Sequence, residues 1–279
     1  MINIPYRAST YVGRRNRKRF MRAAAELAPV TPSSEVPVTV YGFSGEGDWP
    51  EQAACIRSFL RYVGRPKRFV IVSDGTHTET TRRLLEKLHA CVSVVSLSSI
   101  LKPDLPAQVH RYASQHVLGK KLALFLSLPV DGPTIYCDSD ILFFPGAVEL
   151  ANLLRLMENS AMYLLDCWAS LDERLIENAQ EKELPVNSGF VIMGCPLDWS
   201  GPLARLQRMV GDCKFFTEQT IVHLAVKANG GQPLPPATFV LRNEDQFEFV
   251  DRFANRNVAI RHYISSIRTK LWHHLEHFS

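Results

Sequence analysis

The chain has 279 residues, of which 46% are hydrophobic and 22% charged, and its formal net charge is +4. This composition excludes a disordered chain, which has too little apolar surface to fold, and a protein made mainly of membrane spans. A chain of this length buries a sizeable core, and we expect one large α/β domain.

The first 35 residues contain a run of cations from Arg14 to Arg19. Basic clusters attract polyanions, so we weigh peripheral contact with a membrane surface against a solvated helix face, and we expect no nucleic-acid partner. The sequence also predicts a short helix over 17–27 and a Pro/Ser-rich linker over 29–34. We therefore divide the chain into a basic extension, 1–35, and a main domain, 36–279.

Cysteine spacing and hydropathy give an expected location. The six cysteines are well separated and form no CxxC pair, which indicates reduced thiols instead of a zinc or redox site. The longest apolar run, 122–130, is far shorter than a membrane span, and no N-terminal stretch has the pattern of a signal peptide. We expect a cytoplasmic protein with peripheral membrane contact at most.

From residue 36 onward, short β-branched runs alternate with helical segments. Strands are predicted over 38–41, 68–73, 92–97, 134–137, 161–165 and 189–193. Helices are predicted over 49–63, 78–89, 106–128 and 216–228. Strand and helix at this spacing are typical of βαβ units, so we predict a Rossmann-like, mostly parallel central sheet flanked by helices.

An acidic pair, Asp138 and Asp140, directly follows the strand predicted over 134–137. Ligands of open α/β sheets bind beyond the carboxyl ends of the strands, so acidic residues there are informative. Two carboxylates hold a hard divalent cation, and a cation there stabilises a departing nucleoside diphosphate. Asp and Ser are also ordinary turn residues after a strand, so the pair alone does not establish a site.

The segment 135–144, with the sequence IYCDSDILFF, resembles the DxD segment of glycosyltransferase family 8, which includes glycogenin-like and lipopolysaccharide galactosyltransferase-like enzymes. Three further segments match that family in the same order: Lys121 in a helical stretch, 185–192 around Asn187, and 217–220 around Gln219. The resemblance covers roughly 38–272. It implies a GT-A fold and the retaining transfer of a sugar from a nucleoside-diphosphate sugar, most often UDP-linked, to a glycan, lipid or protein hydroxyl.

The resemblance also implies roles for individual residues. Mn2+ or Mg2+ is expected on Asp138, Asp140 and His262. The donor nucleotide and its phosphates are expected on Tyr41, Phe43, Asp74, Lys121, Ser139, Gly189, Arg268 and Lys270. The donor sugar and the chemical step are assigned to Asn187, Glu218, Gln219 and Asp166.

Some of these assignments compete with plain structural interpretations. Tyr41 also fits a half-buried strand aromatic, and Asp74, Asn187 and Asp166 also fit turn or capping positions. The C-terminal spacing departs from the family pattern, so the choice between Arg268 and Lys270 as the phosphate contact stays open. Glu218 stands where the family commonly has Asp, and its longer side chain is expected to alter the choice of sugar.

Two other functions remain open at this point. A haloacid-dehalogenase-like phosphatase also has an apolar strand followed by paired aspartates, but the mid-chain position and the bulky Ile141 after Asp140 oppose it. A non-catalytic nucleotide- or glycan-binding module that kept the fold is the second alternative, because a fold does not prove a function.

Overall fold

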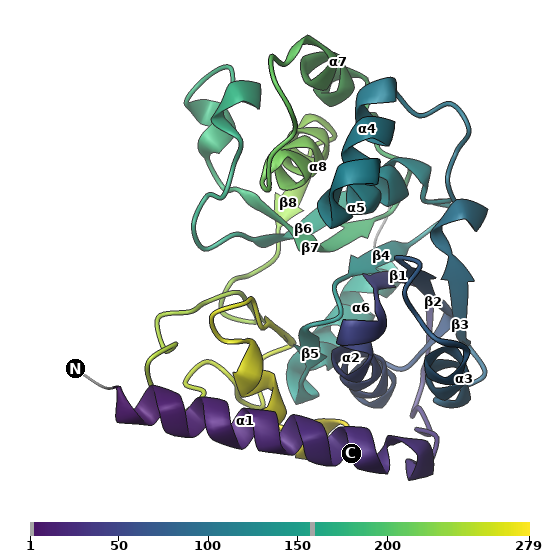
Figure 1. The fold of residues 1–279 in the computed structure, drawn as a ribbon, viewed down its shortest axis with the longest axis vertical. Coiled ribbons are helices and arrows are strands. Elements are labelled where there is room, and N and C mark those ends of the chain that lie inside the picture. The colour runs from purple at the N-terminus through teal and green to yellow at the C-terminus, as the bar shows by residue number, and fades with distance from the viewer. Residues whose placement is uncertain (1–2, 157–159) are drawn as a thin grey trace.

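A seven-stranded sheet with the order β3-β2-β1-β4-β7-β6-β8 forms the centre of the computed structural model, which describes residues 3–156 and 160–279 (Figure 1). Its strands are β1 Glu35–Ser44, β2 Arg65–Ser73, β3 Val92–Ser96, β4 Thr134–Cys137, β6 Ala161–Leu165, β7 Val186–Met193 and β8 Gln232–Pro233. The β3-β2-β1-β4 portion is parallel, β7 is antiparallel to both β4 and β6, and β8 is parallel to β6. The predicted Rossmann-like, mostly parallel sheet is confirmed.

Helices cover both faces of this sheet because its strands are apolar on both sides. The helices are α2 Trp49–Tyr62, α3 Glu79–Lys87, α4 Ala107–Gln115, α5 Val117–Ser127, α6 Val148–Leu156, α7 Ser200–Arg208 and α8 Thr217–Ala228. One face packs on α2, α3 and α6, and the other on α5 and α8, with α4 and α7 outside them (Figure 1). Successive side chains of β1 illustrate this, since Val40 faces the first layer and Tyr41 the second.

The helix predicted over 106–128 is instead two helices, α4 and α5, and this prediction was wrong at one residue. His116 between them has an extended backbone, with φ −144° and ψ 141°, and its Nδ1 accepts a hydrogen bond from the backbone N–H of Leu118. The side chain therefore caps the start of α5 and satisfies a donor that a continuous helix would have paired internally.

The N-terminal helix, α1, spans Ile4–Ala23 and is longer than the helix predicted over 17–27. The side chain of Asn3 caps its first turn by accepting from the Tyr6 N–H. Its inner face packs on the C-terminal segment, where the ring of Phe20 lies 5.3 Å from that of Trp272 and 5.4 Å from that of Phe278 (Figure 1). The division of the chain at residue 35 stays a prediction.

A second, three-stranded sheet connects the end of β4 to the C-terminal part of the chain. It consists of β5 Ile141–Phe143, β9 Phe239–Val240 and β10 Ile260–His262, in the order β5-β10-β9. The antiparallel register places His262 opposite Ile141, next to Asp140. All six cysteines are free, and none of the helices in the described ranges is long and apolar enough to cross a bilayer.

Candidate active site

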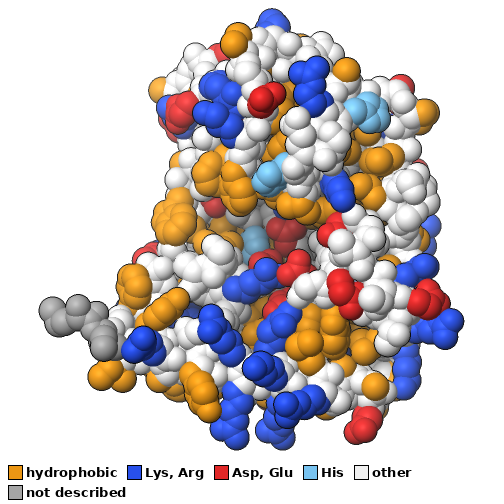
Figure 2. Space-filling model, viewed as in Figure 1, with side chains coloured by type: hydrophobic (Ala, Val, Ile, Leu, Met, Phe, Trp, Pro, Cys, Tyr) orange, Lys and Arg blue, Asp and Glu red, His pale blue; other side chains and the backbone are white. Residues whose placement is uncertain are grey.

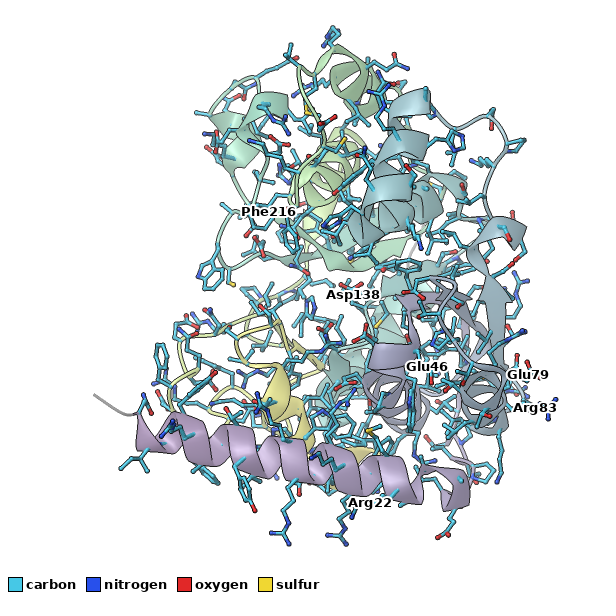
Figure 3. The ribbon with its side chains drawn as sticks, in the orientation of Figure 1. Arg22, Glu46, Glu79, Arg83, Asp138 and Phe216 are labelled. Atoms are coloured by element: carbon cyan, nitrogen blue, oxygen red, sulfur yellow. The ribbon has the colours of Figure 1, made fainter. Side chains whose placement is uncertain are left out.

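A cavity of about 300 Å³ opens beyond the carboxyl end of β4, between β7, the start of α8 and the turn after β10. Figure 2 shows this hollow near the middle of the molecule, with acidic side chains and a histidine in it. Asp138 contributes from the end of β4 and Phe216 from the residue before α8 (Figure 3). Nine of the residues selected from the sequence line the cavity: Lys121, Asp138, Asp140, Asp166, Asn187, Gly189, Glu218, Gln219 and His262.

The two aspartates and His262 are brought together by backbone pairing. The Asp138 N–H donates to the Gly189 carbonyl at 2.8 Å, and the Tyr263 N–H donates to the Asp140 carbonyl at 2.9 Å. As a result, His262 Nε2 lies 3.0 Å from Asp140 Oδ1 and 3.9 Å from Asp138 Oδ2. One ligand atom from each of the three residues lies within 4.8 Å of the others, which is a spacing suited to a shared cation.

The orientation of the His262 ring is fixed by Asn187. The Gly189 N–H donates to Asn187 Oδ1 at 3.0 Å, which identifies that atom as the amide oxygen, and the same oxygen lies 3.0 Å from His262 Nδ1. Nδ1 therefore carries a proton, and Nε2, 3.0 Å from Asp140 Oδ1, is the ring nitrogen that faces the two carboxylates. A cation bound by both carboxylates would accept the Nε2 lone pair in place of this hydrogen bond, and an imidazole whose Nδ1–H is held in this way is typical of a metal ligand.

Gly189 is required by the same arrangement. A Cβ at this position would lie 2.4 Å from His262 Cε1 and 2.8 Å from Asp138 Oδ2, so any side chain would displace two of the three candidate ligands. The expected contact of Gly189 with the donor stays a prediction, and in the structure the glycine leaves room for the ligand side chains.

Cationic side chains lie on two sides of the aspartates. Lys121 of α5 is buried and places its Nζ 3.0 Å from Asp138 Oδ2; burial lowers the pKa of this ammonium, but the Asp138 carboxylate outweighs it and the net pKa is raised. The Arg268 guanidinium donates to Asp48 Oδ1 at 2.8 Å and lies 3.7 Å from Asp140 Oδ2. Burial acts to raise the pKa of Asp140, but His262 and Arg268 outweigh it and lower that pKa.

Lys270, the other candidate for phosphate contact, lies outside the cavity. Its Nζ is buried and donates to the carbonyls of Asp245 and Val250, both at 2.7 Å, and to Asp245 Oδ2 at 3.1 Å. This corrects the assignment of Lys270, because its ammonium is fully engaged in the protein interior. Arg268 does not line the cavity either, but of the two candidates it is the residue beside the acidic pair.

Three polar side chains form a hydrogen-bonded row along the cavity wall. Asn187 Nδ2 donates to Asp166 Oδ1 at 3.2 Å and to Gln219 Oε1 at 3.3 Å. Gln219 Nε2 in turn donates to the Ser170 carbonyl at 2.9 Å. Asn187 therefore joins this row to His262.

Glu218 is buried in the same wall, and its carboxyl group is only half paired. Oε2 accepts from Ser188 Oγ at 3.1 Å, whereas Oε1 has no hydrogen-bond partner among the described residues. Burial raises the pKa of Glu218 to about 7, with Lys121 opposing the shift and Asp138 adding to it. Near neutral pH this carboxyl group can therefore either donate or accept a hydrogen bond.

The remaining selected residues do not line the cavity. Tyr41 and Phe43 pack in the apolar layer beneath α5, which for Tyr41 supports the structural interpretation, and burial raises the pKa of Tyr41. Asp74 accepts from the Thr76 N–H at 2.9 Å, as a turn aspartate does. Ser139 is buried between the two aspartates.

Sequence reasoning missed the rim of the cavity and one partner of Arg268. Trp168, Phe215 and Phe216 are exposed aromatic side chains that line the opening. The adjacent phenylalanines at the start of the helix predicted over 216–228 were a signal that we did not use. The contact between Asp48 and Arg268 could not be predicted from the sequence, because the two residues are far apart along the chain and only the fold brings them together.

No protein-family model and no curated protein sequence matches this chain. Its structure, however, is similar to the galactosyltransferase LgtC in complex with donor and acceptor sugar analogs, with a TM-score of 0.53 and 11% identity over 81% of this chain and 87% of that one. Mouse xyloside xylosyltransferase 1 gives 0.52 and 14% over 84% and 99%. The bifunctional glycosyltransferase WbbM gives 0.53 and 14%, over 85% of this chain but 47% of the larger protein. These neighbours are of the family 8 type that the motifs resemble, and the chain has their GT-A fold.

Proposed function

We propose that the protein is a metal-dependent glycosyltransferase that moves a sugar from a nucleoside-diphosphate sugar, a UDP-sugar, to a hydroxyl acceptor with retention of configuration. The observation that carries this proposal is the convergence of Asp138, Asp140 and His262 Nε2, with Asn187 holding the other ring nitrogen. The GT-A fold and the order of the sequence motifs support it.

Asp138, Asp140 and His262 are the residues that would hold Mn2+ or Mg2+, through two carboxylates and one imidazole. A bound cation supplies positive charge that stabilises the departing diphosphate. Arg268 lies within 3.7 Å of Asp140, so its guanidinium is placed to bind phosphate oxygens on the same side. Lys121 binds them from α5 on the other side of the pair.

The hydrogen-bonded row on the cavity wall would hold the donor sugar. Asn187, Gln219 and Asp166 offer both donors and acceptors to sugar hydroxyls, and the unpaired Oε1 of Glu218 offers one more. Binding the sugar between these groups would fix its anomeric carbon beside the opening of the cavity, where an acceptor enters, which lowers the barrier through orientation. The exposed aromatic rim of Trp168 and Phe216 borders that opening.

The first test is thermal unfolding with UDP, GDP and ADP, each with and without Mn2+. A ligand present at a hundredfold its dissociation constant adds about 2.7 kcal/mol to the free energy of unfolding. We expect a Mn2+-dependent rise in Tm with UDP that is absent in Asp140→Ala. Asp140 is the better target because Asp138 also neutralises the buried Lys121. The absence of a shift with any nucleotide would overturn the proposal.

A second measurement separates the enzyme from its alternatives. Slow release of free sugar from a UDP-sugar, lost in Asp140→Ala, is expected of a transferase without its acceptor. Nucleotide binding without any release or transfer would support the non-catalytic module. Trapping of an aspartyl-phosphate on Asp138 would support the phosphatase.

A further inference from the structure

The outward face of α1 concentrates positive charge. Over its 20 residues the helix contains no aspartate or glutamate. Its exposed cations are Arg7, Arg14, Arg15, Lys18, Arg19 and Arg22. At 3.6 residues per turn these positions fall on one side of the helix, which we call the basic face. In Figure 2 it is the band of blue side chains along the lower edge of the molecule.

The opposite side of α1 is fixed to the protein. A Cβ at Gly13 would lie 2.2 Å from the Thr269 carbonyl oxygen, so the helix backbone touches the C-terminal segment directly. Asn16 Nδ2 donates to the Trp272 carbonyl at 2.9 Å, and Arg17 donates to both oxygens of Glu51 at 2.7 and 2.9 Å. These contacts hold the basic face outward, and no salt bridge joins its cations to a carboxylate within the described ranges.

Exposed apolar side chains adjoin the basic face. On α1 itself, Ile4 and Tyr11 are 72% and 68% exposed. Beside the start of the helix, a loop exposes Phe247 (55%), Phe249 (43%) and Val250 (65%). Together with Tyr6 these residues form what we call the apolar rim.

Two contacts connect this loop to α1. The rings of Tyr6 and Phe247 meet edge to face with their centroids 6.0 Å apart. The ring of Phe249 lies 5.5 Å from that of His273, whose Nε2 is 3.0 Å from the carbonyl oxygen of Ser9 in α1. The loop therefore packs against the inner side of α1 at its N-terminal end, whereas Ile4 and Tyr11 project from the basic face itself at 3.6 residues per turn. The basic face and the apolar rim together form the candidate docking surface.

We propose that this surface docks the protein on an anionic phospholipid bilayer. Cations on a helix lying parallel to a membrane are attracted by acidic headgroups, and neighbouring apolar side chains enter the boundary between headgroups and acyl chains. A nucleic acid would satisfy the cations but would leave Ile4 and Val250 exposed to water. Glu248, an acid within the loop, is paired with Arg252 at 3.3 Å and so opposes docking little. This inference does not depend on the proposed transferase activity.

The test is co-sedimentation of the full chain with vesicles of phosphatidylcholine alone or mixed with phosphatidylglycerol. We expect binding only to the anionic vesicles, and weaker binding as salt screens the headgroup charge. The triple variant Arg15→Glu, Lys18→Glu, Arg22→Glu should bind about a hundredfold or more weakly, because each lysine or arginine near the surface contributes substantially to attraction. The matched control is Lys102→Glu, Arg111→Glu, Arg208→Glu, which changes the net charge equally at the far end of the molecule, near α4 and α7 (Figure 1).

The apolar rim has a separate test at high salt, where electrostatic attraction is screened. Phe247→Ser with Val250→Ser should weaken the remaining binding, whereas Val210→Ser, at an 88% exposed valine elsewhere, should not. Equal loss in both charge-reversal variants, absence of sedimentation with anionic vesicles, or tighter binding of duplex DNA or RNA would overturn the proposal. Thermal unfolding checks that each variant folds, and an Arg/Lys→Gln version of the triple variant serves if charge reversal perturbs the helix.

Discussion

Two clusters of charged side chains lie on opposite sides of β10. One borders a cavity, and the other is buried in the protein interior. The pocket cluster consists of Asp138, Asp140, Asn187, His262 and Arg268. The buried cluster consists of Asp245, Asp251, Arg261, Lys270 and His274. Each contains two aspartates, a histidine and an arginine. Neighbouring side chains of a strand point in opposite directions, so β10 sends Arg261 to one cluster and the next residue, His262, to the other.

The difference between the clusters is the presence of open space. In the buried cluster the charges pair with one another: Arg261 donates to Asp245 at 2.9 Å and also pairs with Asp251, which accepts from the Tyr263 hydroxyl at 2.8 Å. Burial lowers the pKa of His274 to about 4, so its ring is neutral at neutral pH. In the pocket cluster the acceptors converge on a cavity instead. The first arrangement stabilises the irregular segment after β9, and the second is suited to bind a ligand.

The largest effect is expected from Arg261→Ala, which removes the central cation of the buried cluster. The change leaves Asp251 and part of Asp245 as buried carboxylates without their countercharge, which typically costs about 3–5 kcal/mol. Urea denaturation monitored by circular dichroism measures the loss of unfolding free energy. A loss below about 1 kcal/mol, typical of a surface position, would contradict the structural role of this cluster.

The next effect concerns Glu218→Gln and depends on pH. The pKa of Glu218 is raised from 4.5 to about 7 in the folded protein, so between those values the folded state binds a proton that the unfolded state has released. Wild-type stability therefore falls as pH rises through this window, by about 3 kcal/mol relative to the glutamine variant, and the difference is constant above it. Denaturation of both metal-free proteins across this pH range measures the difference. A difference independent of pH would show that Glu218 does not titrate in this way.

The third prediction is that ligand binding depends on the pocket cluster and not on the buried cluster. Asp140→Ala should cost little stability but should remove the Mn2+-dependent gain with UDP, which is about 2.7 kcal/mol at a hundredfold the dissociation constant. In contrast, Arg261→Ala should retain this gain in whatever fraction stays folded. Isothermal titration calorimetry at a temperature where both variants are folded provides the measurement. If Asp140→Ala unfolds, or still binds UDP only with Mn2+, the assignment of the pocket cluster is wrong.

The sequence predicted the central sheet and most of the pocket, because both depend on local patterns. β-Branched runs marked the strands, and the segments around Asp138, Asn187 and Gln219 occur in an order that anticipated their meeting at one sheet edge. Local sequence patterns could not decide whether Arg268 or Lys270 lies beside the acidic pair. Both lie in the 3₁₀ turn Arg268–His273, and only tertiary packing decides that Lys270 points to Asp245.

Three other features of the fold were not predicted, because each depends on short segments or on tertiary contacts. The strands β5, β9 and β10 have three, two and three residues, which is too short for a periodic signal, so the sheet that aligns His262 with Asp140 was not predicted. The break between α4 and α5 depends on one capping histidine in an otherwise helical sequence. The length of α1 was missed because its inner face contains small and polar residues, including Gly13 and Asn16, that fit only against the C-terminal segment.

The smallest effect we expect tests how Asn187 supports the pocket cluster. Its amide oxygen holds His262 Nδ1 at 3.0 Å, so Asn187→Ala frees the imidazole to rotate and should weaken Mn2+ binding about tenfold or more, as loss of a ligand's hydrogen-bond partner generally does. Gln219→Ala is the matched control, since it removes a neighbouring amide that does not contact His262 and should leave Mn2+ affinity unchanged. Titration with Mn2+ followed by electron paramagnetic resonance gives both affinities. Equal affinities in the two variants would mean that Asn187 acts only on the sugar, and that the ring of His262 is held by the close approach of Gly189 alone.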